Sequence, residues 1–254
     1  MSYLRYVAVG DSQTEGLNDG DEETGYRGWA DRLARMLAER EPRLRYANLA
    51  VRGRLAGQIR AEQTAAALAL EPDLVTVMAG MNDLMRPGFD AAAVAEELDA
   101  MLAAFTGCGA RVVTFTYPDI ARLAPLARYA RPRVLDFNAR IRASAARHGA
   151  LLVDTFGYPV TTDPRMFSAD RYHLAPAGHA RLAAAVAEAL GLPGSDGSWA
   201  EPFPPAPPAP LWRRACTELA WASGFAGPWI VRRLRGRSSG DGRSAKRPRL
   251  EPVV

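Results

Sequence analysis

Residues 6–16 read YVAVGDSQTEG, an apolar run of four residues followed by a polar segment that opens and closes with glycine. A short apolar run bounded by turn residues is typical of a buried strand, and the glycines indicate a tight turn where the strand ends. Ser12 is therefore expected at the carboxyl end of a strand, where open α/β sheets bind their ligands. Serine is also common at helix starts, so Ser12 alone does not separate a catalytic residue from a turn residue.

The same alternation of an apolar run and a helical stretch continues to about residue 190. Further strands are predicted at 44–51, 74–78, 112–115 and 151–153, in addition to the first strand at 4–10. A last helix is predicted to begin at Ala175, with Pro176 in its first turn. Five strands that alternate with helices predict a parallel sheet covered on both faces, with right-handed crossovers.

Composition divides the chain into four parts. We expect an α/β domain at 1–195, an extended proline-rich linker at 196–210, a short helical segment at 211–235 and a basic, disordered tail at 236–254. The expectation of disorder comes from the low apolar content of the tail, which carries mostly arginine, serine, glycine and proline.

The positive charge of the chain is concentrated in its last quarter. Residues 196–254 hold ten Lys/Arg and five Asp/Glu, whereas residues 1–195 hold 22 and 23 and are close to neutral. The domain itself therefore lacks the basic surface of a nucleic-acid-binding protein. Contact of the basic tail with a membrane surface or an acidic partner stays open as the less favoured alternative to a solvated run.

Targeting signals are not evident in the sequence. No stretch approaches the roughly 18 apolar residues of a membrane span, and Met1 leads directly into the first strand without a secretory signal. The two cysteines, Cys108 and Cys216, do not make a disulfide framework. These features predict a cytoplasmic protein.

Residues suited to acyl-transfer chemistry follow the predicted strands. A serine hydroxyl is a weak nucleophile and needs a base, and His173 has a suitable side chain with a pKa near neutrality. Asp170 lies three residues earlier, so a tight turn can bring its carboxylate to the other ring nitrogen and fix the tautomer. We therefore predict Ser12, His173 and Asp170 as the catalytic residues.

Acyl transfer also needs hydrogen-bond donors for the oxyanion that forms on the substrate carbonyl. The backbone N–H groups of Ser12 and Gly53 and the side-chain amide of Asn82 can supply three, because each residue follows a predicted strand. Glycine suits the second position, since it lets the backbone approach the substrate closely.

Two other histidines and a second serine motif compete with these residues. His179 lies inside the last predicted helix and is expected to pack or hydrogen-bond there, and His148 ends a helix, where it can interact with the dipole. Residues 236–240 match the G-x-S-x-G nucleophile pattern, but no strand precedes them. We therefore favour Ser12 and His173.

Four sequence blocks carry a resemblance to the SGNH, or GDSL-like, hydrolase family. They are Gly10-Asp11-Ser12, Asn48-Leu-Ala-Val-Arg-Gly53, Gly80-Met81-Asn82-Asp83 and Asp170-Arg-Tyr-His173. The resemblance covers about residues 4–190, and the second block is its loosest match. It implies a flavodoxin-like, three-layer α/β/α sandwich and ester hydrolysis without a metal or cofactor, with the catalytic and oxyanion-hole roles given above.

The family does not name a substrate, because it spans esterases, lipases, thioesterases and carbohydrate deacetylases. We expect a small-molecule ester substrate with a short acyl chain, since the loops at 17–27 and 119–131 form no obvious large apolar lid. Three alternatives stay open: an acyltransferase, a carbohydrate deacetylase with the same site, and a non-catalytic binding module of the same fold.

Overall fold

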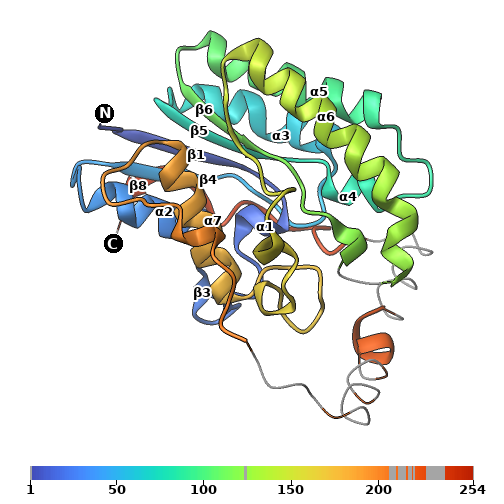
Figure 1. The fold of residues 1–254 in the computed structure, drawn as a ribbon. Helices are drawn as coiled ribbons and strands as arrows, with labels where there is room; N and C mark the ends of the chain where they lie inside the picture. Colours follow the sequence, from blue (N-terminus) through green and yellow to red (C-terminus); the bar gives the residue numbers. More distant parts are fainter. Residues whose placement is uncertain are drawn as a thin grey trace.

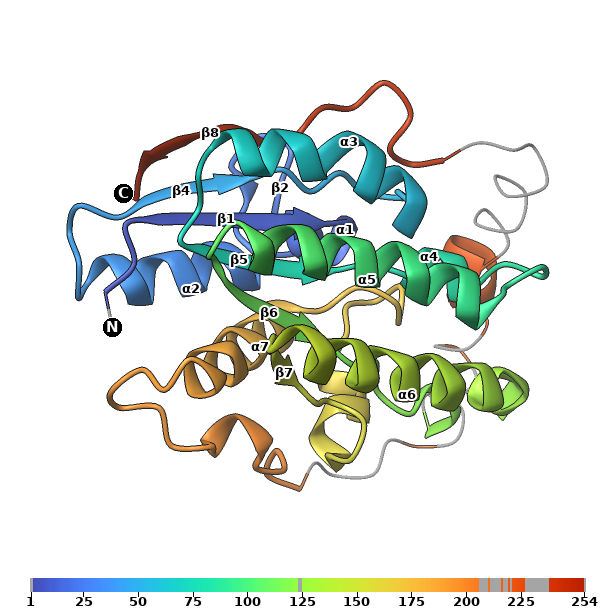
Figure 2. The ribbon, with the colours of Figure 1, turned by 90° about the horizontal axis from the view of Figure 1, so that it is seen from above.

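A single mixed sheet forms the centre of the computed structural model, which describes residues 2–122, 125–205, 210, 216, 219, 221–226 and 238–253. Its strands are β1 (Arg5–Gly10), β4 (Arg45–Asn48), β5 (Leu74–Met78), β6 (Arg111–Phe115), β7 (Leu151–Val153) and β8 (Arg247–Pro252). They lie in the order β7-β6-β5-β1-β4-β8, and only β8 is antiparallel to its neighbour (Figure 2).

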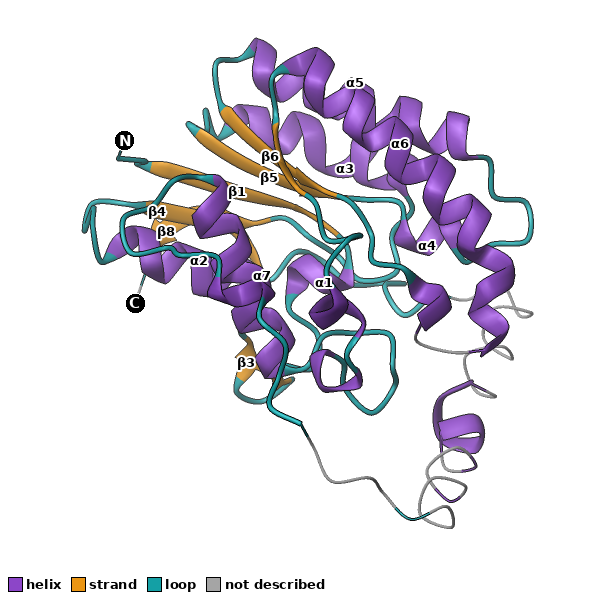
Figure 3. Cartoon of the chain, in the orientation of Figure 1, coloured by secondary structure: helices purple, strands orange, loops and turns teal. Residues whose placement is uncertain are grey.

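Helices cover both faces of this sheet, as expected for a three-layer sandwich (Figures 1 and 3). One face carries α2 (Trp29–Ala38) and α7 (Pro176–Ala189), which pack against each other. The other face carries α3 (Ala56–Ala69), α5 (Ala91–Gly107) and α6 (Arg131–His148). Two short helices, α1 (Ser12–Glu15) and α4 (Met81–Leu84), lie at the carboxyl ends of β1 and β5.

Strand β1 lies in the middle of the core. The side chains of residues 6–9 are all fully buried, because helices cover the strand on both sides. This explains why the strand reads as a continuous apolar run and does not alternate with polar residues. It pairs in parallel with β4 on one side and β5 on the other, so the carboxyl ends of the three strands meet at one edge.

The strands and helices predicted within residues 4–190 are confirmed, with ends that move by a few residues. The strands predicted at 74–78 and 151–153 have the bounds of β5 and β7, and α7 begins at Pro176, one residue after the predicted start. The loop predicted at 17–27 contains a hairpin of two short strands, β2 (Gly20–Asp21) and β3 (Gly25–Tyr26). The loop at 119–131 contains short 3-10 turns in its described residues.

The prediction of a five-stranded, fully parallel sheet with a disordered tail is wrong at the last strand. Residues 247–252 of the tail form β8, which pairs antiparallel with β4 and makes the sheet six-stranded (Figure 2). The segment contains Pro248 and Pro252, which weaken any strand signal in the sequence, but an edge strand tolerates proline because one side of it needs no N–H donors. The helical segment predicted at 211–235 lies largely outside the described residues.

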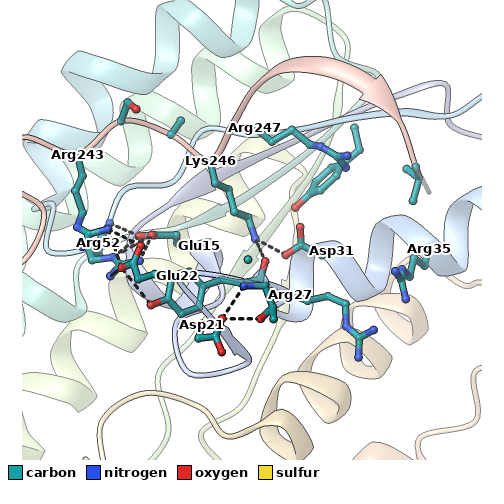
Figure 4. A pocket seen from close by; sticks show the side chains of 17 residues that line it. Glu15, Asp21, Glu22, Arg27, Asp31, Arg35, Arg52, Arg243, Lys246 and Arg247 are labelled. Atoms are coloured by element: carbon teal, nitrogen blue, oxygen red, sulfur yellow. Dashed lines mark hydrogen bonds and ion pairs between the residues drawn. The ribbon is translucent and has the colours of Figure 1, made fainter.

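Charge also holds the tail on the domain. Lys246, the single lysine of the chain, contacts Asp31 of α2 at 2.6 Å and the backbone oxygen of Tyr26 at 2.8 Å (Figure 4). Arg243 contacts Glu22 of the β2–β3 hairpin at 2.9 Å. Several tail cations therefore have acidic partners on the domain, and burial raises the pKa of Asp31 even though Lys246 opposes that change.

In the described part of the chain, no helix combines the length and the apolar character needed to cross a membrane.

Replacing Lys246 tests whether the tail stabilises the fold. In Lys246→Met the Asp31 carboxylate loses its cation, and its side chain is only 17% exposed. Breaking a fully buried pair costs about 3–5 kcal/mol, so for this mostly buried pair at the surface we expect the free energy of unfolding to fall by about 1–3 kcal/mol. Urea denaturation measures it.

The matched control is the double variant Asp31→Asn/Lys246→Met, in which no charge is left without a partner. We expect it to regain part of the lost stability. A single variant as stable as the wild type would show that the tail does not support the domain.

Candidate active site

Ser12 begins a helix directly after the central strand. Strand β1 ends at Gly10, Asp11 caps α1 by accepting a hydrogen bond from the Gln13 N–H at 3.2 Å, and α1 runs from Ser12. A side chain at position 10 would put its Cβ 2.8 Å from the backbone oxygen of Met78 on β5, so the close approach of the two strands requires glycine. Ser12 is 3% exposed and lies at the carboxyl edge of the sheet.

The structure brings Ser12, His173 and Asp170 into one hydrogen-bonded chain. Nε2 of His173 lies 2.9 Å from Oγ of Ser12, and Nδ1 of the same ring lies 2.7 Å from Oδ2 of Asp170. The turn that carries Asp170 and His173 immediately precedes α7, so the packing of α7 on the sheet sets its position. The sequence prediction placed these three side chains together, and the geometry agrees.

The Asp170 carboxylate accepts several hydrogen bonds at once. Its donors are the His173 ring and backbone, the Tyr172 N–H, the Ser168 hydroxyl and the Asn18 side-chain amide. Burial raises the pKa of Asp170, but these hydrogen bonds and the charge of His173 outweigh it and hold the pKa well below its ordinary value. Asp170 is therefore ionised and fixed, as the partner of an imidazolium must be.

Gly53 lies in a turn at the end of the segment that follows β4. Its φ of 76° is in the left-handed region, which explains why glycine occupies the position. The preceding residue, Arg52, is buried, and its backbone N–H donates to Oε2 of Glu15 at 2.8 Å while its guanidinium pairs with the same carboxylate. This pair joins the turn to α1, and the Gly53 N–H has no partner among the described residues.

Asn82 reaches the same region from the start of α4. Its Nδ2 donates to Oδ2 of Asp11 at 2.9 Å and to the backbone oxygen of Arg54 at 3.1 Å. Asp11 is fully buried, and this burial raises its pKa to about 7, although hydrogen bonds from Gln13 and Asn82 oppose the shift. The amide predicted as an oxyanion donor is thus beside the nucleophile segment, with both of its hydrogens engaged.

Gln13 is a site residue that the sequence reasoning missed. Its side-chain amide donates to the backbone oxygen of Tyr172 at 2.8 Å and accepts from the Leu174 N–H at 3.3 Å. It thereby holds the residues on both sides of His173 against α1. The only feature of the sequence that could have pointed to Gln13 was its place next to Ser12. The backbone groups that a side-chain amide contacts depend on the tertiary fold.

The contacts of the competing residues, His179, His148 and Ser238, fit structural roles. The His179 ring is buried, accepts from the Trp29 N–H at 3.1 Å through Nδ1 and faces the Leu17 oxygen through Nε2, so it is neutral with its proton on Nε2. His148 ends α6 and contacts Asp99 at 2.9 Å. Ser238 of the G-x-S-x-G match enters a turn and has no histidine partner among the described residues.

A polar cavity of about 590 Å³ lies next to this region, between the β2–β3 hairpin, α2 and the tail (Figure 4). Glu15 and Arg52 line it, but Ser12 and His173 do not. Within the described residues, no group of three or more histidine, cysteine or acidic side chains is arranged to hold a metal ion.

Comparison with known proteins places the chain in a family. The model of the GDSL-like Lipase/Acylhydrolase family matches residues 8–181, which is more than half of the chain. The chain belongs to this family. Among curated proteins, none matches the sequence.

Solved structures share the fold of this GDSL-like protein. LAE5, an alpha/beta hydrolase enzyme from the metagenome of Lake Arreo, Spain, is 26% identical with a TM-score of 0.62, over 75% of this chain and 96% of its own. TesA is 26% identical with a TM-score of 0.61, over 74% and 98%. Axe2, an acetylxylan esterase from Geobacillus stearothermophilus, is 19% identical with a TM-score of 0.64, over 80% and 98%, which shows the fold alone.

The buried His179 predicts a pH dependence of stability for this GDSL-like protein. Burial lowers the pKa of His179 from 6.5 to about 4, so between these values the unfolded chain binds a proton that the folded chain does not. Stability is then full above pH 6.5 and falls as the pH drops towards 4, by roughly 3 kcal/mol in total. We expect His179→Gln to be less stable than the wild type at pH 7, and this gap to shrink at pH 4, in urea denaturation. A gap independent of pH would contradict the assignment.

The contacts of Gln13 predict an effect on turnover. In Gln13→Ala the turn that carries His173 loses two hydrogen bonds to α1, so this predicted base is less well positioned. We expect kcat for ester hydrolysis to fall about tenfold, because small misplacements of catalytic groups are costly. Steady-state kinetics with a short nitrophenyl ester measures it.

Gln58→Ala is the matched control, because Gln58 makes its backbone contact at the start of α3, accepting from the Leu55 N–H at 3.0 Å. It should keep the wild-type kcat. Equal kcat values for Gln13→Ala and the wild type would remove Gln13 from the site.

Proposed function

We propose that this protein hydrolyses carboxylic esters through a covalent acyl-enzyme, with Ser12 as the nucleophile, His173 as the base and Asp170 as the residue that orients it. The observation that carries the proposal is the hydrogen-bonded chain from Oγ of Ser12 through both ring nitrogens of His173 to Asp170, at 2.9 and 2.7 Å. Membership in a lipase and acylhydrolase family supports the same class of reaction.

The first half of the reaction acylates Ser12. Its Oγ attacks the carbonyl carbon of the ester while Nε2 of His173 accepts the hydroxyl proton, and Asp170 stabilises the imidazolium that forms. The imidazolium then donates this proton to the leaving alcohol as the C–O bond breaks. In the second half, His173 takes a proton from water, the resulting hydroxide attacks the acyl carbon, and Ser12 recovers its proton as the acid leaves.

The tetrahedral oxyanion in both halves needs donors that are already in place. Two backbone groups suit this role: the Ser12 N–H, which begins a helix and so has no acceptor within it, and the Gly53 N–H, which has no partner in the described part of the chain. The Asn82 amide can become the third donor when its longer contact, to the Arg54 oxygen, gives way to the substrate. Its contact with Asp11 keeps the amide oriented meanwhile.

A short acyl chain suits this site best. Ser12 is 3% exposed and Asn82 is 4% exposed, so only a small part of each residue is accessible to a substrate carbonyl. The described residues around them contribute no large apolar lid that would hold a long chain. We therefore infer a small-molecule ester substrate and no nucleic-acid partner.

A fluorophosphonate probe and a panel of nitrophenyl esters test this proposal. We expect the wild type to form a covalent adduct and to hydrolyse acetyl and butyryl esters faster than longer ones. Ser12→Ala should lose the adduct and several orders of magnitude in rate, since the nucleophile and its base act as a unit.

The same experiment separates the alternatives. A correctly folded wild type that is neither labelled nor active would indicate a non-catalytic binding module. Transfer of the acyl group to an added alcohol in preference to water would indicate an acyltransferase.

A further inference from the structure

The C-terminal segment, described at residues 221–226 and 238–253, contacts the turn that carries His173, the proposed base, and Asp170, the residue proposed to orient it. Nε1 of Trp221 donates to the backbone oxygen of Asp170 at 3.0 Å. The guanidinium of Arg171, the next residue in that turn, lies over the indole ring at 4.9 Å. One side chain from outside the hydrolase domain therefore contacts two consecutive residues of the turn.

This turn needs external support. Arg171 has a φ of 58°, in the left-handed region that a residue with a side chain rarely adopts. Such a backbone persists only where the surroundings fix it, and here the hydrogen bond and the stacking of Trp221 act on its outer side. The inner side is held by Gln13, through its contacts with the backbone of Tyr172 and Leu174.

The returning part of the same segment contacts the second turn of the site. The Ser238 hydroxyl faces the backbone oxygen of Gly53 at 3.4 Å, and a Cβ on Gly53 would lie 2.2 Å from that hydroxyl oxygen. A Cβ on Gly240 would lie 1.9 Å from the backbone oxygen of Arg52. The two backbones therefore touch directly, and they can do so only because residues 53 and 240 are glycines.

The turn at residues 52–53 is thus held from two sides. Glu15 of α1 binds the backbone and the guanidinium of Arg52 on one side, and residues 238–240 lie against the backbone on the other. The Gly53 N–H, the proposed oxyanion donor, belongs to this turn. Downstream, Lys246 and β8 fasten the segment to α2 and β4 (Figure 4).

The segment lies beyond the family match, which ends at residue 181. A segment that only protected the edge of the sheet would need β8 alone. Here it also meets the catalytic region at two separate turns, one for the base and one for an oxyanion donor.

We propose that the C-terminal segment positions the catalytic groups: Trp221 holds the turn of Asp170 and His173, and residues 238–240 hold Gly53. The proposal rests on the ester hydrolase function proposed above. Trp221, Ser238 and Gly240 are positioning residues, because they act through the two turns and not on the substrate itself.

Two point variants of the full-length chain test the proposal. Trp221→Phe keeps an aromatic ring for Arg171 but removes the N–H donor, and we expect kcat for a short nitrophenyl ester to fall about three- to tenfold. Gly240→Ala forces the Arg52 backbone to move, and we expect kcat to fall about ten- to a hundredfold, approaching the loss of one oxyanion donor. KM should stay within about twofold in both, because the turns act on the transition state more than on substrate binding.

Gly242→Ala is the matched control. Gly242 has a φ of 73°, and a Cβ at this position would have nothing within 4 Å, so an alanine strains the same segment without pressing on Arg52. It should keep the wild-type kcat. Lys246 provides a second readout: as the only lysine, its acylation by an amine-reactive reagent, followed by mass spectrometry, reports whether the segment stays docked.

Each outcome decides the question. A lower kcat in Trp221→Phe and Gly240→Ala with a folded domain supports the proposal, whether Lys246 stays protected or reacts faster as the segment detaches. A wild-type kcat in both variants, docked or detached, overturns it, and so does an equal loss in Gly242→Ala. A wild type that hydrolyses no ester overturns instead the function on which the proposal rests.

Discussion

The hydrogen bond between Ser12 and His173 is the constraint on which the rest of the arrangement depends, because it joins two residues that are 161 positions apart. Ser12 follows β1, whose residues 6–9 are fully buried, and His173 precedes the helix that packs against α2. Neither position is free to adjust, since each is set by an element of the core. The packing of the core therefore brings the hydroxyl close to the imidazole, and the contacts of the surrounding turns fix the positions of both groups.

Buried polar side chains fix these positions, and nearly all of those in the described residues have a hydrogen-bond or ion-pair partner. Glu15 and Arg52 join α1 to the second turn, Asp11 and Asn82 join the end of β1 to α4, and Gln13 joins α1 to the turn of His173. A buried charge or amide without a partner is costly, so each pair fixes one relative position of two segments. Together these contacts hold the site before any substrate arrives, which is what electrostatic stabilisation of a transition state requires.

Polar contacts also hold the C-terminal segment in place, at the edge of the sheet. Its prolines and charged residues exclude it from a central strand, yet an edge position beside β4 needs only one row of backbone hydrogen bonds. Salt bridges to Asp31 and Glu22 replace the apolar burial that the segment lacks. In this way the edge of the sheet passes from β4 to β8, whose two prolines leave fewer backbone N–H groups for pairing with another chain.

The sequence by itself determined the parallel α/β core and, to within a few residues, its strands, because continuous apolar runs and turn glycines are local signals. Ser12, His173, Asp170, Gly53 and Asn82 were candidates at that level, since acyl transfer needs those chemical groups. Only the tertiary structure revealed β8, the Lys246–Asp31 pair and the contacts of Gln13 and Trp221. Those depend on which groups meet across the fold, and a residue's neighbours in space leave no periodic pattern in the chain.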